Sequence, residues 1–355
     1  MRIAQIAPLL ESVPPRLYGG TERVVSYLTE ALVERGHQVT LFASGDSATS
    51  GDLTSFREQA LRLDPAPQKS ALAAHLSMLH GIRQCADDFD VLHFHIDLLP
   101  FPIFETVAHK TVTTLHGRQD KQDLAQAYRR WSGFPLVSIS DSQRKPMPWA
   151  NWFDTIHHGL PPGLCIPPSR PACDYLAFLG RLSPEKRPDR AIEIARRVGM
   201  PLKIAAKVGA GDQRYFHQTI APMLEGADVE FIGEIDDSRK SEFLGNAAAL
   251  LFPIDWPEPF GLVMIEAMAC GTPVVAWREG SVPEIVDDGI SGRVVDGMEE
   301  AVAAVAEVRT YDRRRIRACF DRRFDASRMV DRYESLYLRL TQEQPVLKQP
   351  VLKKA

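Results

Sequence analysis

Residues 258–275 read E-P-F-G-L-V-M-I-E-A-M-A-C-G-T-P-V-V and carry the most informative pattern in the chain. Residues 260–270 are apolar nearly all round, which predicts a buried helix after a loop that contains Glu258. The apolar run at residues 273–276 then predicts a buried strand. The carboxylate of Glu266 lies inside the apolar helix. Because a buried carboxylate is costly unless it is hydrogen-bonded or paired, the sequence predicts polar partners for Glu266.

Two kinds of partner fit this pattern. A ribose diol would satisfy Glu266, as it does acidic residues in dinucleotide-binding folds, and an arginine would satisfy it in a purely structural role. Glu258 is predicted to face a reaction cleft, or else to be an ordinary carboxylate stabilised by the helix dipole. The N–H groups at the start of the helix would meet an anion, and they belong to Phe260, Gly261 and Leu262. Gly261 also lets the backbone approach a ligand closely.

A second motif, G-R-L-S-P-E-K at residues 180–186, follows an apolar run at 175–179 that predicts a strand. Open α/β sheets bind ligands beyond the carboxyl ends of their strands. Arg181 and Lys186 can therefore aim at one diphosphate, where two fixed cations would stabilise the charge that grows on a leaving group. The plainer interpretation is a surface loop with two basic residues.

Outward from these motifs, strands and helices alternate along the chain. The first half predicts strands at residues 3–7, 39–43, 91–94, 111–115 and 136–139 and helices at 24–36, 70–86 and 121–131. After a proline-dense boundary at 159–171, the second half predicts strands at 175–179, 202–206, 229–232, 249–252 and 273–276 and helices at 189–198, 260–270, 311–320 and 327–340. Such alternation predicts an α/β fold with two parallel sheets, each covered by helices on both faces.

The two motifs together resemble the donor site of the family-four (GT4) retaining glycosyltransferases of GT-B fold, whose E-x7-E pattern matches Glu258 and Glu266. The loop Y-G-G-T-E-R and the strand end T-T-L-H-G fit the same family, so the resemblance covers essentially residues 1–340. It implies two Rossmann-like domains that face each other across a cleft, and a C-terminal helix that crosses back to the N-terminal domain. The expected parts are an acceptor-binding domain at 1–165, a donor domain at 172–322, a closing helix at 323–343 and a flexible tail at 344–355.

The resemblance also implies a role for single residues. Arg181 and Lys186 would hold the diphosphate of the donor. Glu266 would hold the ribose, and Glu258 would bind a hydroxyl of the donor sugar. His116 ends the strand at 111–115 and would touch the donor sugar, at its 6-hydroxyl, or the acceptor, without acting as a nucleophile. A histidine that merely caps local backbone is the alternative for this position.

Two further stretches of the sequence also resemble the family. Gly19 and Gly20 precede the first helix and would contact the donor phosphate or the acceptor, although a plain turn explains them equally well. Ile232 and Glu234 lie in F-I-G-E-I-D at residues 231–236, where the family binds the nucleobase largely through backbone groups. Base identity is therefore poorly encoded, and we expect uridine only because it is common among the family's donors.

Two residue pairs would suit a metal ion by type. His93 and His95 alternate along a strand, and Asp88 and Asp90 form the D-x-D typical of the other glycosyltransferase fold. The sequence offers the histidines no evident third ligand, so we expect them to line the acceptor side or to be structural. The aspartates flank a helix end and a strand start, where a solvated surface is expected. We expect neither a metal nor a cofactor besides the nucleotide sugar.

Length and composition restrict the domain number, the partners and the cellular compartment that can be expected. With 355 residues two domains are expected, and a formal net charge of −4 gives no general attraction to nucleic acid. The 5 cysteines show no C-x-x-C spacing, which predicts reduced thiols. Together with the absence of a signal peptide pattern and of a long apolar run, this predicts a cytoplasmic protein, while peripheral membrane contact and oligomeric state stay open. A solvated helix face, rather than an anionic partner, is expected for Arg313, Arg314, Arg315, Arg317, Arg322 and Arg323.

The expected reaction is transfer of a hexose, with retention and without a metal, from a nucleotide-diphosphate sugar to a hydroxyl acceptor. Loops at 47–67 and 98–105 would shape the acceptor site, and the opening residues resemble a bacterial subgroup of the family. A GT-B epimerase or phosphorylase and a catalytically silent sugar-nucleotide-binding protein are the alternatives. A nicotinamide oxidoreductase is disfavoured because no G-x-G-x-x-G follows the first strand.

Overall fold

The computed structural model describes residues 1–225 and 228–342, and the chain divides into two compact units. Unit 1 comprises Met1–Ile139, Arg144–His157 and the segment that begins at Met329. Unit 2 comprises Ser140–Gln143 and His158–Arg328. The expected tail at 344–355 lies outside the described residues.

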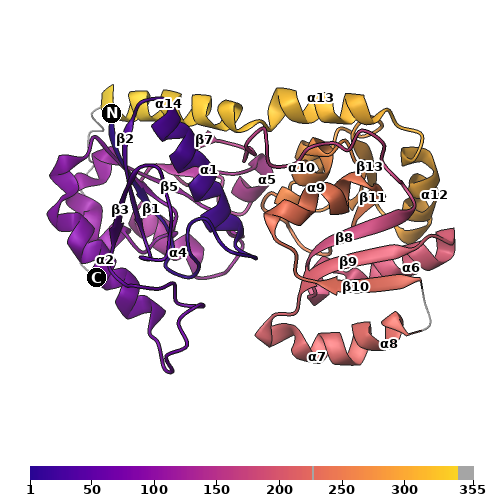
Figure 1. Cartoon of the computed structure of the whole chain (residues 1–355). Coiled ribbons are helices and arrows are strands. Elements are labelled where there is room, and N and C mark those ends of the chain that lie inside the picture. Colours follow the sequence, from indigo (N-terminus) through magenta and orange to yellow (C-terminus); the bar gives the residue numbers. More distant parts are fainter. Residues whose placement is uncertain (226–227, 343–355) are drawn as a thin grey trace. The chain divides into compact units, whose positions relative to one another are not determined.

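Unit 1 is built on a 7-stranded sheet of parallel strands in the order β3-β2-β1-β4-β5-β6-β7 (Figure 1). The register pairs Gln5 on β1 with His93 on β4, so these two polar side chains lie on one face of the sheet. The strands are β1 (Arg2–Ile6), β2 (Gln38–Ala43), β3 (Asp52–Ser55), β4 (Val91–Phe94), β5 (Thr111–Thr114), β6 (Leu136–Ser138) and β7 (Trp152–Thr155).

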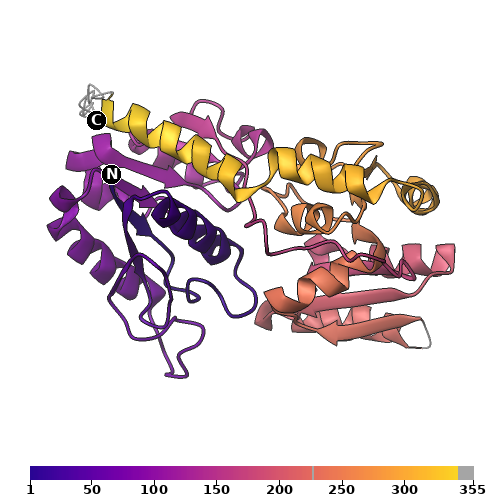
Figure 2. The ribbon, with the colours of Figure 1, turned by 45° about the horizontal axis from the view of Figure 1, so that its top comes forward.

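The helices of unit 1 bury their apolar stripes on this sheet. Val24, Leu28 and Leu32 recur at helical spacing on α1 and are fully buried. The last helix, α14, runs along unit 1 (Figure 2) and buries Tyr333 and Tyr337. The helices are α1 (Gly20–Glu34), α2 (Ala71–Gln84), η1 (Ala86–Asp88), α3 (Phe101–Phe104), η2 (Glu105–Lys110), α4 (Leu124–Arg130), α5 (Asp141–Arg144, which unit 1 shares with unit 2) and α14 (Ala326–Gln342).

Unit 2 has a 6-stranded parallel sheet in the order β10-β9-β8-β11-β12-β13. Its strands are β8 (Tyr175–Arg181), β9 (Leu202–Lys207), β10 (Val229–Gly233), β11 (Ala247–Phe252), β12 (Val274–Trp277) and β13 (Gly292–Val295). The chain begins this sheet at β8, extends it through β9 to β10, and then returns to the other side of β8 with β11. The carboxyl ends of β8 and β11 therefore flank the point where the strand order reverses, which is where open α/β sheets bind ligands.

Helices cover the sheet of unit 2, and α10 is the most deeply buried stretch of the apolar motif. It packs against α9 and α13, and every residue from Met264 to Ala269 is buried. The helices are η3 (Pro184–Lys186), α6 (Pro188–Val198), η4 (Ala210–Asp212), α7 (Gln213–Tyr215), η5 (Phe216–Ile220), α8 (Ala221–Leu224), α9 (Asp237–Gly245), α10 (Leu262–Ala269), α11 (Val282–Ile285), α12 (Met298–Val308) and α13 (Arg313–Arg323).

The predicted fold class, two α/β units with parallel sheets and a C-terminal helix that joins the first unit, is confirmed. The prediction missed three strands, β3, β7 and β13, and all three lie at sheet edges. Edge strands carry fewer apolar residues because only one side is paired and part of the surface faces water. In β3 no residue is buried, so its sequence shows no apolar run to detect.

Candidate active site

The carboxyl edge of the unit 2 sheet gathers most of the predicted site. Arg181 is the last residue of β8, and Lys186 ends the short helix η3 that follows. Glu258 lies in the loop between β11 and α10. Because β8 and β11 are parallel neighbours, these loops emerge side by side at the point of strand reversal.

Lys186 and Glu258 are in direct contact across this point, with Lys186 Nζ against Glu258 Oε2. The side chains are only 16% and 10% exposed. Trp256 completes the group: its Nε1–H donates to Glu258 Oε2 at 3.0 Å, and its ring centroid lies 4.7 Å from Lys186 Nζ. The ammonium is therefore held by a carboxylate and by an aromatic face in a mostly buried place.

Neighbouring ion pairs hold the two loops together. Arg187 adopts a left-handed backbone conformation, with φ 53°, and pairs with Asp189 at 2.8 Å and with Asp255 at 2.9 Å. The N–H of Asp255 donates to the Glu185 carbonyl at 2.9 Å. Since Asp255 lies in the loop after β11 and Arg187 follows η3, these contacts fix the place of Lys186 relative to Glu258.

Arg181 contacts a different set of carboxylates. Its guanidinium contacts Glu185 and lies 3.4 Å from Asp212. Burial by itself raises the pKa of Glu185, but hydrogen bonding and the Arg181 charge outweigh it and leave this pKa below its usual value. The structure thus places both cations at the same sheet edge, each with its own acidic partner. Their joint hold on a diphosphate stays a prediction.

Glu266 has a polar partner, as predicted, but the partner is a lysine. Lys240 Nζ on α9 lies 2.6 Å from Glu266 Oε1, and the residues are 6% and 3% exposed. Lys240 also pairs with Asp237 at 2.9 Å. The alternative of a structural arginine is therefore wrong. The sequence did not predict Lys240 as the partner of Glu266. Asp236, a favourable N-cap residue after residues 229–232, was the available signal for the helix that carries this lysine.

The start of α10 needs a glycine at position 261, and the predicted close approach of a ligand stays a prediction. Gly261 has φ 79°, and a Cβ there would lie 2.7 Å from Met264 Cε. Phe260 is buried beside it, and Leu262 is the first residue of the helix. The left-handed turn brings the chain from Glu258 into the helix within three residues, so that the carboxylate and the helix N-terminus share one loop.

Gly280 and Ser281 pack against the loop that contains Glu258. The sequence did not predict this contact. The N–H of Ser281 donates to the Glu258 carbonyl at 2.9 Å, and its hydroxyl donates to the Phe260 carbonyl at 2.9 Å. Gly280 has φ 55°, and a Cβ there would lie 2.3 Å from the Glu258 nitrogen. A glycine in the loop after the predicted strand at 273–276, followed by serine, was the only sequence signal for this contact.

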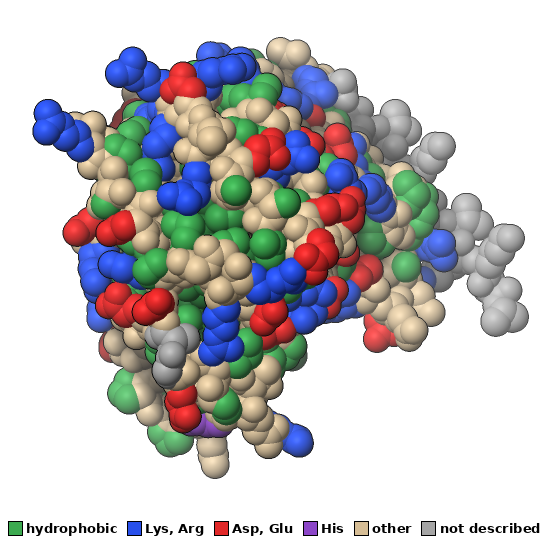
Figure 3. All heavy atoms as spheres, turned by 90° about the vertical axis from the view of Figure 1, so that its right-hand side faces the viewer, with side chains coloured by type: hydrophobic (Ala, Val, Ile, Leu, Met, Phe, Trp, Pro, Cys, Tyr) green, Lys and Arg blue, Asp and Glu red, His purple; other side chains and the backbone are tan. Residues whose placement is uncertain are grey.

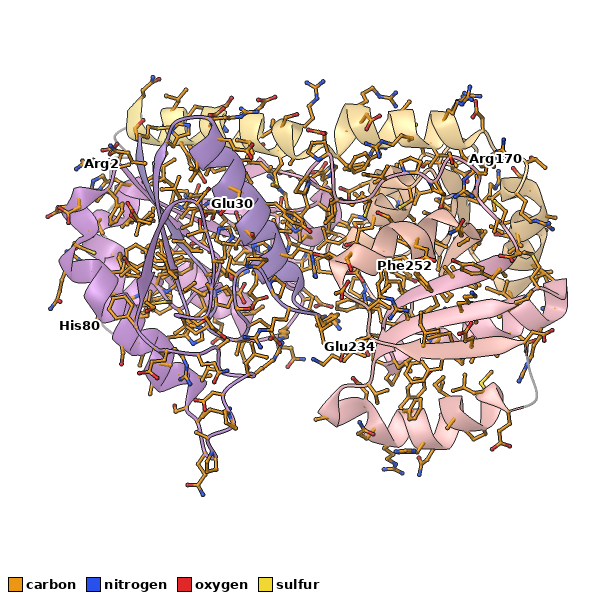
Figure 4. The ribbon with its side chains drawn as sticks, in the orientation of Figure 1. Arg2, Glu30, His80, Arg170, Glu234 and Phe252 are labelled. Carbon is orange, nitrogen blue, oxygen red and sulfur yellow. The ribbon has the colours of Figure 1, made fainter. Side chains whose placement is uncertain are left out.

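Ile232 and Glu234 lie at the same edge. Ile232 is the residue before the last one of β10, Gly233 ends the strand with φ 75°, and Glu234 follows with an exposed side chain (Figure 4). The stretch then leads into α9, which carries Lys240. The predicted nucleobase loop and the partner of Glu266 are thus consecutive parts of the chain.

In unit 1 His116 follows β5 beyond its carboxyl end. Its Nε2 lies 2.9 Å from Nδ1 of His95, and the His95 Nε2 lies 2.9 Å from Gln5 Oε1. Burial lowers the pKa of His116 from 6.5 to about 3, so this imidazole is neutral at physiological pH. His116 therefore has a side-chain partner in His95, which directly follows the neighbouring strand β4.

Comparisons with known proteins agree with this geometry. The family described as "Glycosyltransferase Family 4" matches residues 18–159, and "Glycosyl transferases group 1" matches residues 170–316. The chain belongs to the family-four glycosyltransferases. The two matches fall on either side of the proline-dense stretch that the sequence predicted as a boundary.

One relative is similar over most of this transferase, and another over less than half of it. A phosphatidyl-myo-inositol mannosyltransferase of Mycolicibacterium smegmatis is 26% identical over 346 residues, which cover 86% of this chain and 85% of the relative. A D-inositol 3-phosphate glycosyltransferase of Catenulispora acidiphila is 35% identical over 161 residues, which cover 42% of this chain and 35% of the relative.

Solved structures share the fold. AviGT4, a glycosyltransferase involved in avilamycin A biosynthesis, matches with a TM-score of 0.73 at 24% identity and covers 96% of this chain and 98% of its own. Sucrose-phosphate synthase from Thermosynechococcus elongatus matches with a TM-score of 0.78 at 18% identity, covering 96% and 99%. Anabaena HepE, solved in complex with UDP and glucose, matches with a TM-score of 0.73 at 19% identity, covering 94% and 98%. The GT-B fold of this transferase follows from these matches.

Gly19 and Gly20 of the transferase lie at the start of α1. Gly19 is buried, and a Cβ there would lie 2.7 Å from the Cβ of Pro15, so the loop packs too closely for a side chain. Gly20 is exposed and is the first residue of the helix. Glu22, in the first turn of the helix, is buried, and burial raises the pKa of its carboxyl. The contact of this loop with a phosphate or an acceptor stays a prediction.

The residues with metal-binding potential have other contacts. His93 and His95 lie on one face with ring centroids 4.1 Å apart, and both hydrogen-bond to neighbouring side chains. Asp88 is exposed, and the Asp90 carboxylate pairs with Arg2 at 3.0 Å. In the part of the chain that the structure describes, no three His, Cys, Asp or Glu residues group as a metal site would need.

The arginine cluster on α13 is not simply a solvated face, so that expectation was wrong for half of it. Arg313 donates to the Ala247 carbonyl at 2.9 Å, and Arg317 donates to the Ala269 carbonyl at 2.8 Å. Arg323 pairs with Asp287 at 2.6 Å. The first two satisfy carbonyls at the start of β11 and at the end of α10. Over the face of the molecule in Figure 3, basic and acidic side chains are interspersed.

No helix among residues 1–225 and 228–342 combines the length and the apolar character that a membrane crossing requires.

Proposed function

We propose that this family-four glycosyltransferase transfers a hexose from a nucleotide-diphosphate sugar, with UDP as the expected nucleotide, to a hydroxyl of its acceptor with retention of configuration. The observation that carries the proposal is the contact of Lys186 with Glu258 at the strand reversal of unit 2, directly before the N-terminus of α10. A cation and a helix N-terminus suit a phosphate group, and a carboxylate suits sugar hydroxyls.

The charges of the site support the binding of a diphosphate. Lys186 is held by Glu258 in the described structure, and Arg181 by Glu185 and Asp212. A diphosphate would draw the two cations to its oxygens, and Glu258 would then be released to bind the hydroxyls of the sugar. Exchange of one anionic partner for another keeps both cations paired throughout, which limits the desolvation cost of binding.

In the proposed reaction the bond between the anomeric carbon and the phosphate oxygen breaks while the acceptor oxygen bonds to that carbon from the same face. The departing phosphate oxygen takes the acceptor proton, so the protein needs no nucleophile of its own. Lys186, Arg181 and the N–H groups at the start of α10 stabilise the charge that develops on the leaving phosphate, and we propose that no metal is required.

The ribose and the base would lie between α10 and the end of β10. Glu266 is already charge-compensated by Lys240, so it can accept two ribose hydroxyls without becoming an isolated buried charge. Backbone groups of Ile232 and Glu234 would contact the base. In support, HepE, which shares the fold, has been solved with UDP and glucose and with UDP-glucose.

A screen of donors and acceptors tests the proposal. Purified protein is incubated with UDP-, GDP- and ADP-linked hexoses and with acceptors that include inositol and inositol phosphates, because two relatives are named for inositol-containing acceptors. Mass spectrometry should detect one glycosylated product, and the proton coupling at its anomeric carbon should show the configuration of the donor. Activity should persist in EDTA.

Four results would each count against a specific part of the proposal. A changed donor sugar in the absence of acceptor would favour the epimerase, and phosphate-dependent cleavage of a glycoside would favour the phosphorylase. An inverted product would overturn the mechanism above. Donor binding by calorimetry, without any turnover over the full acceptor panel, would favour the silent binding protein.

A further inference from the structure

A chain of buried polar side chains runs through unit 1 from α14 to His116. Tyr337 on α14 has its hydroxyl 3.1 Å from Gln5 Nε2 on β1. Gln5 Oε1 lies 2.9 Å from His95 Nε2, and His95 Nδ1 lies 2.9 Å from His116 Nε2. Gln5, His95 and Tyr337 are all buried. Three hydrogen bonds thus link the C-terminal helix to the imidazole that we place at the donor sugar.

A second branch leaves the same tyrosine. The Tyr337 hydroxyl lies 2.7 Å from His93 Nδ1, and His93 Nε2 lies 2.7 Å from Thr114 Oγ1. Thr114 Oγ1 in turn lies 2.9 Å from the hydroxyl of Tyr333. This branch ends at Tyr333, one turn before Tyr337 on α14, and does not lead to His116.

The amide of Gln5 determines which atom donates and which accepts in the hydrogen bonds of both branches. Its Nε2 can only donate, so the Tyr337 hydroxyl oxygen accepts from it. The Tyr337 O–H in turn donates a hydrogen bond to His93 Nδ1. Its Oε1 can only accept, so His95 carries its proton on Nε2. The Nδ1 of His95 is then an acceptor, which requires the proton of His116 to lie on Nε2.

This assignment needs neutral imidazoles, each with one N–H and one lone pair. Burial lowers the pKa of His93 well below 6.5 and that of His116 to about 3, so both are neutral at the pH of the cell. A neutral imidazole in water populates two tautomers, and a fixed neighbour selects one of them. The chain of donors from Gln5 supplies that neighbour.

We propose that Gln5 and Tyr337 are positioning residues which, through His95, hold His116 as its Nε2–H tautomer, so that Nδ1 accepts a hydrogen bond from a hydroxyl of the sugar. The role of the bound hydroxyl rests on the proposed function, whereas the tautomer does not. With this tautomer His116 recognises an O–H donor and cannot donate to an ether or ring oxygen through Nδ1. The C-terminal helix, through Tyr337, thereby takes part in sugar recognition.

Two tyrosines on one helix provide a matched pair of variants. Tyr337→Phe removes the acceptor for Gln5 Nε2, so the amide loses the contact that fixes its orientation. Tyr333→Phe makes the same chemical change one turn away, in an equally buried side chain, but the hydroxyl that it removes is bonded to Thr114, in the branch that does not lead to His116. Gln5→Met, which keeps the shape and removes both polar atoms, is the strongest variant.

The measurement is the nitrogen NMR spectrum of histidine-labelled protein without any ligand, with the His116 signals assigned by their loss in His116→Gln. In the unaltered protein, Nε2 should give the signal of a protonated nitrogen and Nδ1 that of an unprotonated one. Gln5→Met and Tyr337→Phe should show a mixture of tautomers, whereas Tyr333→Phe should match the unaltered protein. Turnover of the donor should fall about fivefold to tenfold in Gln5→Met, as expected for one lost neutral hydrogen bond.

The opposite tautomer in the unaltered protein, or unchanged His116 signals in Gln5→Met, would overturn the inference. So would equal effects of the two tyrosine variants on the His116 signals. Because the spectrum needs no substrate, these outcomes are independent of the reaction. If the tautomer is as stated but His116→Gln leaves turnover unchanged, the proposed role of His116 at the sugar fails and the tautomer assignment stands.

Discussion

Lys240 on α9 and Glu266 on α10 form a buried ion pair, with 2.6 Å between Nζ and Oε1. The pair joins two helices that follow different strands, and it leaves one carboxylate oxygen of Glu266 for a further partner. A buried charge of this kind contributes to stability only as long as its partner is present, because the cost of burying an unpaired charge is large. The pair therefore links the stability of unit 2 to the proposed ribose site.

Replacement of Lys240 by Met should lower the free energy of unfolding by about 3–5 kcal/mol, because it leaves the Glu266 carboxylate buried and unpaired. The double variant Lys240→Met with Glu266→Leu should regain most of this loss, since neither charge remains. It should nevertheless bind the nucleotide sugar weakly. Urea unfolding and donor calorimetry measure the two effects separately. A double variant that is stable and binds the donor normally would remove Glu266 from the ribose site.

Replacement of Lys186 by Met should lower kcat by about 100- to 1000-fold and change donor affinity much less, because the ammonium acts mainly on charge that develops at the leaving phosphate. Lys203→Met is the control, since Lys203 is a partly exposed lysine of the same unit that pairs with Glu230 at 3.8 Å. Steady-state kinetics and donor calorimetry provide the numbers. Equal losses in turnover and affinity would contradict the assignment.

Replacement of Gly280 by Ala should impair both folding and turnover, because its Cβ would lie 2.3 Å from the Glu258 nitrogen and 2.4 Å from the Glu258 oxygen. Gly289→Ala is a close control: Gly289 also has a left-handed backbone, with φ 79°, but a Cβ there would meet no atom within 4 Å. That variant should lose only about 1 kcal/mol of stability, the cost of the backbone conformation itself. Similar kinetics for the two variants would show that Gly280 does not support Glu258.

The free energy of unfolding should decrease as the pH falls from about 6.5 to about 5. Burial lowers the pKa of His116 from 6.5 to about 3, so in this window the unfolded chain binds a proton at this residue that the folded protein does not. The same holds in direction for His75 and His93, whose pKa values burial also lowers. His116→Gln should reduce the slope by up to about 1.4 kcal/mol per pH unit, which urea unfolding at several pH values can measure. An unchanged slope would mean that His116 titrates normally.

Much of the site could be predicted because its residues belong to local motifs. Lys186, Glu258 and Gly261 occur in stretches whose apolar runs and turns reveal a strand end and a helix start. Lys240 could not be found in this way, because its contact with Glu266 joins residues 26 positions apart on two helices. The role of Gly280 could not be predicted for the same reason, since only the folded chain brings it against the backbone of Glu258.

The sequence alone determined the α/β class and the family, because both follow from periodicity and from contiguous motifs. Tertiary structure alone decided which charges pair and which nitrogen of His116 carries its proton. The pairing depends on the order of parallel strands, which places the loops after β8 and β11 side by side. The proton depends on a chain of contacts between Gln5, His95 and Tyr337, and Gln5 and Tyr337 are separated by 332 positions along the sequence.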